Sequence, residues 1–380
     1  MMFVLALTFC CSSFYRKFLH KDESSTWSTY FPSTTMPSIT KGRNPNLSAN
    51  VNSASEYYLS FCEFSFIKNN AVTVNGANII MLISDSTFFN CSKLITSSSE
   101  SHIYGCILSF NGTQSSKFQQ VRVCASLCRF ILENNSLSIT NPDRSYTVSN
   151  ISNSFYSDIF SYSKLQYGHF ESITSEESAC SELSTFYGCG DFHLGLGTSY
   201  MRTHNALFQE NNITHCFSRY YADFYLRGYT DDSDISHART KYNQLDNLYV
   251  GDLYVLFFQW TDATMENTNI HDCLDINGFF GTLFTSSAPL TVKHCSFINL
   301  TKGDFYTFKF TNFSCTIDFI DTYFEDSGVT KFSNPVTFSA PTCEYIAPHA
   351  DEQKPQLPES NKKFERPIKG LMYLGLQCIV

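Results

Sequence analysis

The sequence predicts an all-β protein folded as a right-handed parallel β-helix of roughly 13 coils, and three observations lead to this prediction. Phe alone accounts for 36 of the 380 residues, and aromatic residues make up 16% of the chain. Short apolar runs rich in Phe, Tyr, Ile, Val and Thr alternate with Asn, Asp, Ser and Gly, which is typical of short strands and turns. Two kinds of marker return after about 22 residues along the body of the chain.

The first marker is an apolar residue followed closely by Asn. Such tags end at Asn69, Asn90, Asn111 and Asn134, so that the gaps are 21, 21 and 23 residues. A repeat of this length fits a leucine-rich repeat or a parallel β-helix, and the L-x-x-L-x-L pattern of the former is missing. Coils of a β-helix stack about 4.8 Å apart, so Asn stacked at an inward turn can form an amide ladder. Parallel crossovers are right-handed, which sets the expected hand.

The second marker is cysteine, of which the chain has 15. No C-x-x-C pair occurs, which argues against a structural zinc site and leaves disulfides or buried thiols. Cys273 and Cys295 are 22 residues apart, and Cys315 follows after 20. We expect these three to stack in successive coils with Cα atoms about 5 Å apart, as packed thiols or as bridges.

The chain divides by composition into five segments. The body is uniform except for a middle stretch, 176–250, where loops look inserted between coils. The ends of the rod would expose strand edges, so caps are expected there. The predicted segments are a signal peptide at 1–13, a Ser/Thr/Pro-rich lead-in or cap at 14–54, the parallel β-helix at 55–345, a Pro- and charge-rich linker at 346–369 and a short apolar tail at 370–380.

The two ends indicate a secreted or cell-surface protein. An apolar run at 3–11 precedes small residues, which fits a signal peptide and is too short to span a bilayer; a buried N-terminal strand is the alternative. The tail at 370–380 is either the start of a membrane anchor missing from this chain or a segment that docks on the fold. N-x-S/T sequons give glycosylation candidates. They are Asn46, Asn90, Asn111, Asn134, Asn150, Asn212, Asn299 and Asn312.

These features carry a resemblance to a known group of proteins. The F-x-x-N tags at Phe66–Asn69 and Phe208–Asn211, with a cysteine in each short Phe/Asn-rich coil, resemble right-handed parallel β-helix surface proteins. Such proteins are similar to the pectin-lyase fold and to polymorphic outer-membrane protein repeats, and large sets occur in parabasalid protists. The Gly-Gly-Ala tag of the bacterial repeats is absent here. The resemblance implies a secreted or cell-surface protein with an adhesive role.

The same fold also serves polysaccharide lyases and hydrolases, which need carboxylates gathered on one face. A hard cation such as Ca²⁺ needs several carboxylate oxygens, and even spacing places two carboxylates on one face of a strand. Solvated loops and ordinary turn charges are the alternative interpretation of these residues. The candidates are Asp231, Asp232 and Asp234 for a cation, and the pairs Asp318–Asp326 and Asp321–Glu325 for acid–base work.

The net charge of −9 argues against a nucleic-acid partner. No catalytic, cofactor-binding or metal-binding residue is assigned, and no cofactor is expected. The leading hypothesis is a non-enzymatic β-helix that presents a face for adhesion to an unknown glycan or protein. A carbohydrate-active enzyme of the pectin-lyase type and a structural coat or spacer protein are the alternatives.

Overall fold

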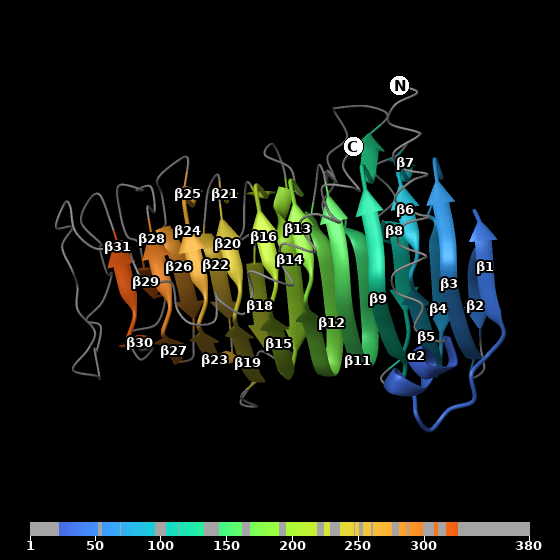
Figure 1. Ribbon diagram of the computed structural model, residues 1–380, viewed down its shortest axis with the longest axis horizontal. Coiled ribbons are helices and arrows are strands. Elements are labelled where there is room, and N and C mark those ends of the chain that lie inside the picture. The colour runs from blue at the N-terminus through green and yellow to red at the C-terminus, as the bar shows by residue number, and fades with distance from the viewer. Residues whose placement is uncertain are drawn as a thin grey trace.

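The protein is all-β, and its strands pair in parallel. In the computed structural model the coils follow one another along the long axis, so that the colour of Figure 1 runs from blue to red from one end to the other. This arrangement is consistent with a β-solenoid. The structure describes residues 23–51, 55–68, 70–95, 104–113, 115–132, 144–161, 168–189, 195–218, 224–228, 236–246, 248–250, 254–259, 261–275, 281–286, 289–298, 308–310 and 317–325.

Most strands belong to three ladders, and we call one passage through the three ladders a coil. Long strands bend at a corner and therefore serve more than one ladder. Ladder A contains β2 (Leu47–Val51), β4 (Val72–Gly76), β8 (Tyr104–Asn111), β11 (Arg144–Ser161), β12 (Gly168–Glu182), β14 (Gly195–Thr203), β18 (Phe224–Gly228), β22 (Tyr254–Gln259), β26 (Gly281–Ser286) and β29 (Phe308–Phe310). Ladder B contains β1 (Ile39–Arg43), β3 (Ser55–Ser65), β5 (Ile79–Ser84), β9 (Lys117–Ser126), parts of β11 and β12, β15 (Asn205–Gln209), β19 (Ser236–Lys241), β23 (Thr261–Glu266), β27 (Leu290–Lys293) and β30 (Ile317–Ile320).

Ladder C consists of very short strands, usually three residues long. Two small sheets follow it along the chain: β7 (Ser92–Ile95) with β10 (Arg129–Leu132), and β17 (Phe217–Ser218) with β21 (Tyr249–Val250) and β25 (Leu274–Asp275). Ladder C contains the ends of β3, β9 and β11, then β6 (Thr87–Phe89), β13 (Thr185–Tyr187), β16 (Asn212–Thr214), β20 (Gln244–Asp246), β24 (Asn269–His271), β28 (Ser296–Ile298) and β31 (Tyr323–Glu325).

The pairing register shows that the predicted uniform period is wrong, because the coils differ in length. From β3 onward, the shortest described coil of ladder C leads from Glu63 to its partner Thr87. The longest coil follows directly and leads from Thr87 to its partner Cys124. From β3 onward, every described coil of this ladder is longer than the spacing that the Asn tags suggested, whereas the coil before it, from Arg43 to its partner Glu63, is shorter. The estimate of 13 coils was calculated from that period and is therefore also wrong. From β3 to β31, ladder C has ten strands in the described part of the chain.

Two predicted boundaries also differ from the structure. The ladders run without interruption through the described parts of 176–250, which was predicted to be irregular. The Ser- and Glu-rich sequence at 176–182 forms part of β12 because only every second side chain must be apolar. The strands β1 and β2 pair with β3 and β4, so the ladders begin inside the segment 14–54.

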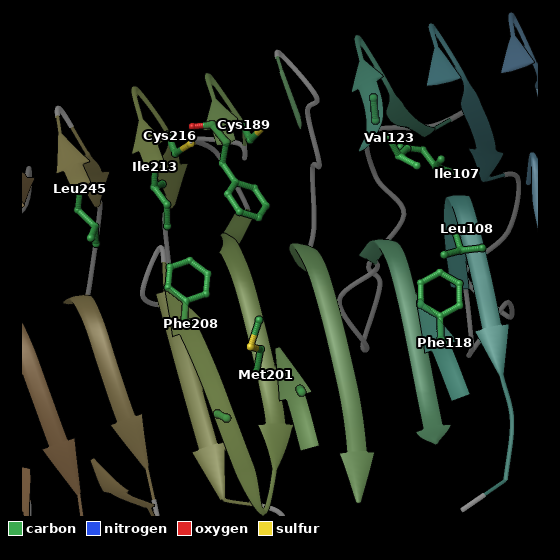
Figure 2. Close-up of a cluster of buried hydrophobic side chains, with 14 of the residues drawn as sticks. Ile107, Leu108, Phe118, Val123, Cys189, Met201, Phe208, Ile213, Cys216 and Leu245 are labelled. Atoms are coloured by element: carbon green, nitrogen blue, oxygen red, sulfur yellow. Dashed lines mark hydrogen bonds between the residues drawn. The ribbon is translucent and has the colours of Figure 1, made fainter. Parts of the chain in front are cut away.

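The core is made of columns of similar side chains. Along ladder C the middle residue points inward in every strand whose side chains the structure describes, and the rings of Phe64 and Phe88 lie 4.6 Å apart and nearly parallel. Figure 2 shows inward side chains of several coils converging in the interior, among them Phe208 and Ile213. Stacking places each apolar group on its equivalent in the next coil, so burial repeats with every coil. The buried column of ladder C includes Phe64, Phe88, Ala125, Phe186, Ile213, Leu245, Ile270 and Phe297.

One helix, α2 (Glu23–Tyr30), covers the outer face of ladder B in the first coils (Figure 1). Trp27 packs on Phe31 and Tyr58, with ring centroids 4.8 and 5.7 Å apart. Leu82 and Val121 complete this second apolar cluster. In the described residues no helix is both long and apolar enough to cross a membrane.

Two corners of a coil lie on either side of ladder C, and in six described coils one residue at each of them adopts a positive φ. The first corner separates ladder B from ladder C, and the second follows ladder C five residues later. The left-handed region costs a non-glycine residue about 1–2 kcal/mol, yet bulky residues occupy it here. The pairs are Phe61 and Phe66, Asp85 and Asn90, Arg122 and Leu127, Leu183 and Gly188, Glu210 and His215, and Asn267 and Asp272.

Replacing Leu127 by Gly is expected to stabilise the protein by about 1 kcal/mol. Leu127 has φ 56° and is 43% exposed, so glycine relieves the backbone at little loss of buried surface. The free energy of unfolding from urea titration measures this. Met36→Gly is the matched control, because Met36 is 37% exposed and has no positive φ. A Leu127→Gly protein that is no more stable than Met36→Gly would show that the corner is not strained.

Candidate functional site

The residue that follows the first corner points inward and carries a hydrogen-bond donor in nearly every coil. The side-chain donor bonds to backbone carbonyl oxygens at the bend, one in its own coil and one in the preceding coil. Thr322 Oγ1 donates to Val292 O at 3.3 Å and to Ile320 O at 3.1 Å. Cys295 Sγ lies 3.5 Å from Met265 O and 3.2 Å from Lys293 O, in the same arrangement. The first-corner positions are Cys62, Ser86, Val123, Ser184, Asn211, Asn243, Thr268, Cys295 and Thr322.

Two Asn at first-corner positions in neighbouring coils form a ladder of side-chain to backbone hydrogen bonds, which differs from the predicted ladder of side-chain amides bonded to one another. Asn243 Oδ1 accepts from the backbone N–H of Asn211 at 3.0 Å. Asn211 Oδ1 accepts in turn from the N–H of Ser184 at 2.8 Å. Their Nδ2 groups donate to Phe208 O and Ser181 O. All these groups are buried, where an unpaired amide would cost about 1–3 kcal/mol, so the ladder fixes the corner.

At most second corners, the residue that follows the positive-φ residue is a cysteine. Figure 2 shows Cys189 and Cys216 side by side on neighbouring coils. Cys216 Sγ donates to Phe186 O and to Thr214 O, both at 3.5 Å, which repeats the pattern of the first corner. Register places Leu248 in the same column, since Thr214 pairs with Asp246 and Phe217 with Tyr249. The second-corner positions are Ile67, Cys91, Cys128, Cys189, Cys216, Leu248 and Cys273.

The predicted stack of Cys273 on Cys295 is therefore wrong. Ile270 pairs with Phe297, so Cys273 follows a second corner, whereas Cys295 follows the first corner of the next coil. The separation of the two cysteines along the chain is thus shorter than the coil that leads from Ile270 to Phe297. The shortfall equals the five residues between the first and the second corner. Cys315 lies outside the described residues.

Burial keeps two of these thiols, Cys62 and Cys295, protonated. Desolvation raises the pKa of Cys62 to about 11 and that of Cys295 to about 12. A protonated thiol can donate, which is what its place beside two carbonyl oxygens requires. Cys91 differs, because a hydrogen bond with the Cys128 side chain lowers its pKa and outweighs the effect of burial. Cys124, whose side chain is half-buried, is disulfide-bonded.

Substitution of Cys295 by Thr is expected to be tolerated within about 0.5 kcal/mol, whereas Cys295→Ala should cost about 1–2 kcal/mol. Thr268 and Thr322 already occupy the equivalent position in the two neighbouring coils. Alanine removes the donor and leaves two buried carbonyl groups less well satisfied. Thermal and urea unfolding of both variants measure the difference. Equal losses in the two variants would mean that the donor has no part in stabilising the corner.

The structure separates the predicted glycosylation sites. Asn46 and Asn111 are exposed, and Asn90 is half-buried at a second corner. Asn212 is only 3% exposed, and its side chain accepts a hydrogen bond from Thr214 Oγ1 at 2.7 Å. Asn212 is thus not a glycosylation site of the folded protein, because a strand of ladder C buries it. Asn150 lies within β11, while Asn134, Asn299 and Asn312 lie outside the described residues.

The structure describes three of the carboxylates predicted for an enzyme, Asp318, Asp321 and Glu325. Asp321 occupies a first corner and Glu325 ends the next strand, so the expected pairing on one strand face is wrong. Asp318 lies on β30, before that corner. Among the described residues no group of three His, Cys, Asp or Glu side chains is placed to hold a metal ion. The predicted cation ligands Asp231, Asp232 and Asp234, and also Asp326, lie outside these residues.

A serine–histidine contact that the sequence did not suggest lies on ladder C. His271 Nε2 is 3.1 Å from Ser296 Oγ. Ser296 Oγ donates its proton to Asn269 Oδ1 at 2.6 Å, so the histidine is not positioned to remove it. Ser296 is also only 2% exposed. The three side chains therefore form a buried hydrogen-bond network that ties β24 to β28.

The outer face of ladder B, from β12 to β30, presents polar side chains in regular rows. Each coil adds outward side chains, and successive strands lie about 4.8 Å apart. His237 Nδ1 lies 3.9 Å from Asp262, and Lys293 Nζ lies 3.8 Å from Glu266. Arg239 is exposed beside them. We call this surface the polar face; its outward residues are Ser178, Cys180, Glu182, Asn205, Leu207, Gln209, His237, Arg239, Lys241, Asp262, Thr264, Glu266, Thr291, Lys293, Asp318 and Ile320.

No protein-family model, curated protein or solved structure matches this chain. Its function is therefore inferred from the corners and from the polar face.

Proposed function

We propose that the protein is a right-handed parallel β-helix, secreted or carried on a cell surface, that binds a glycan or protein ligand without acting as an enzyme. The single observation that supports this proposal best is the polar face. Its side chains are held in rows by strand pairing, so little ordering is needed when a ligand binds. The right hand is what parallel crossovers adopt in general.

The contrast between the two ends of ladder B supports a role for the polar face. In the first coils the outward residues Tyr58, Leu82 and Val121 are apolar and lie beneath α2. In the later coils Arg239 and Asp262 occupy outward positions and are exposed. A regular, rigid surface with charges of both signs suits a polar ligand that lies along the ladder.

The proposal is tested with the purified full chain on a glycan array and against candidate cell-surface proteins. Arg239→Ser should weaken any specific binding by about tenfold or more, because it removes an exposed charge from the polar face. Lys68→Ser, an exposed cation away from ladder B, is the matched control and should leave binding unchanged. Binding that is lost equally in both variants would contradict a role for the polar face. Shortening of an offered polysaccharide would favour an enzyme instead.

A further inference from the structure

Two cysteine pairs occupy equivalent positions in neighbouring coils. Phe89 pairs with Ser126, and Ser92 pairs with Arg129, so Cys91 and Cys128 between them are directly opposite. Opposite residues of neighbouring strands lie about 4.8 Å apart, within the Cα separation of about 4.4–6.8 Å that a disulfide needs. Both thiols are fully buried.

The second pair repeats this geometry elsewhere in the protein. Tyr187 pairs with Thr214, and the N–H of Gly188 donates to Thr214 O at 3.0 Å. Cys189 and Cys216 follow two residues later on each strand, and Figure 2 shows them adjacent. Cys216 Sγ reaches Phe186 O at 3.5 Å, a carbonyl of the coil that carries Cys189. The sulfur of Cys216 thus points toward the neighbouring coil.

Two other corner cysteines face different residue types at the equivalent positions of the adjoining coils. Both follow a first corner. Cys62 is next to Ser86, and Cys295 lies between Thr268 and Thr322. They share the burial and the corner geometry of the paired cysteines, so they differ from them chiefly in their neighbours.

We propose that Cys91–Cys128 and Cys189–Cys216 are two disulfide cross-links between neighbouring coils, formed by exchange with a small-molecule disulfide such as glutathione disulfide. The Cys128 Sγ lies 3.7 Å from Phe88 O, a carbonyl of the coil that carries Cys91, and the side chains of Cys91 and Cys128 interact through a hydrogen bond. The cross-links concern the stability of the fold and do not depend on the proposed binding function.

The chemistry balances in two exchange steps. The thiolate of Cys91 attacks one sulfur of glutathione disulfide, and one glutathione leaves as a thiolate. The thiolate of Cys128 then attacks the Cys91 sulfur of this mixed disulfide, and the second glutathione leaves. The two protein thiols lose two electrons, which reduce one glutathione disulfide to two glutathiones, and their two protons pass to these products. Because both thiols are buried, the oxidant meets them before the coils stack or when the corner opens.

The test maps the thiols of the reduced full chain after equilibration in glutathione buffers of increasing oxidising strength. Acid quenching, alkylation in denaturant and mass spectrometry of the peptides then identify each link. The expected products join Cys91 to Cys128 and Cys189 to Cys216, while Cys62 and Cys295 are alkylated. Cys124, which is disulfide-bonded in the structure, provides the reference for sufficient oxidation. Oxidation should raise the thermal midpoint by about 5 °C or more.

Variants separate the two links. Cys91→Ser should abolish the first link, leave Cys128 alkylated and keep the second link, and Cys189→Ser should do the reverse. Alkylation of all four cysteines in a buffer in which Cys124 is oxidised would overturn the proposal. Glutathione retained on these cysteines, or links to Cys62 or Cys295 at similar yield, would overturn it equally. Mapping of the unmodified chain decides the question even where a variant fails to fold.

Discussion

Replacing Phe88 by Ala is expected to lower the free energy of unfolding by about 4 kcal/mol. Phe88 is 1% exposed, and its ring lies 4.6 Å from that of Phe64 in the preceding coil. Strand pairing on both sides fixes the spacing of the coils, so the wall of the cavity cannot collapse into the space of the missing ring. Urea titration followed by circular dichroism measures the loss.

The neighbouring residue provides a control on the same strand. Phe89 points outward, is half-buried and meets Phe66 edge to face at 5.7 Å. We expect Phe89→Ala to cost about 1 kcal/mol, because it removes a partly solvated ring and leaves no cavity. A loss for Phe89→Ala that matches the loss for Phe88→Ala would contradict the assignment of Phe88 to the interior.

Replacing Trp27 by Ala is expected to detach α2 from ladder B and to cost about 3–4 kcal/mol. Trp27 is 1% exposed, packs on Phe31 and Tyr58, and donates from Nε1 to Thr34 Oγ1 at 3.1 Å. A free helix of eight residues is not stable in water, so α2 should unfold when this contact is lost. Hydrogen exchange should rise across Glu23–Tyr30 while the strands beyond β9 keep their protection.

Loss of the helix also has a surface consequence. Leu82 and Val121 would become exposed beside Tyr58, and a fluorescent dye that binds apolar surface should then bind the variant. Ser28→Ala is the control, because Ser28 lies on the exposed side of α2. Unchanged exchange across α2 in Trp27→Ala would show that other contacts hold the helix.

The sequence was sufficient to predict parallel strands, because alternating apolar residues and frequent turn residues are local features. It was not sufficient for the period. Cysteine follows a residue with positive φ at both corners, as at Cys62 and Cys295 after a first corner and at Cys91 and Cys216 after a second corner, so the cysteine spacing mixed the two corners. The Asn tags mixed the two as well: Asn90 is a second-corner residue, whereas Asn211 follows a first corner.

A longer signal could have separated the corners. Six residues run from one inward donor to the next, as in STFFNC (86–91), STFYGC (184–189), NNITHC (211–216) and TNIHDC (268–273). The first residue is the donor, the third is the inward apolar residue of ladder C, and the fifth has the positive φ. The number of residues between one such hexapeptide and the next differs from coil to coil. A search for a repeat of one fixed period therefore misses it.

Helix α2 was not predictable from local pattern either. Its sequence ESSTWSTY has one large apolar residue and no stripe of apolar residues along one face. Only the apolar outer face of the first coils, which belongs to residues far along the chain, gives Trp27 a place to pack. The polar face likewise depends on register, since Lys241, Glu266 and Lys293 become neighbours only when coils of unequal length are aligned.

The two corners of a coil are always five residues apart in the described pairs, whereas the rest of the coil varies in length. The segment between the corners must therefore keep its length, and the remainder of the coil can change. Peptides added outside this short motif enlarge a loop and leave the neighbours above and below in register, as the long coil between Thr87 and Cys124 already demonstrates. New surface, including whole grafted epitopes, can therefore be acquired one coil at a time without rebuilding the interior. The loops of such a scaffold can vary in sequence and length while the interior and the strand pairing stay the same.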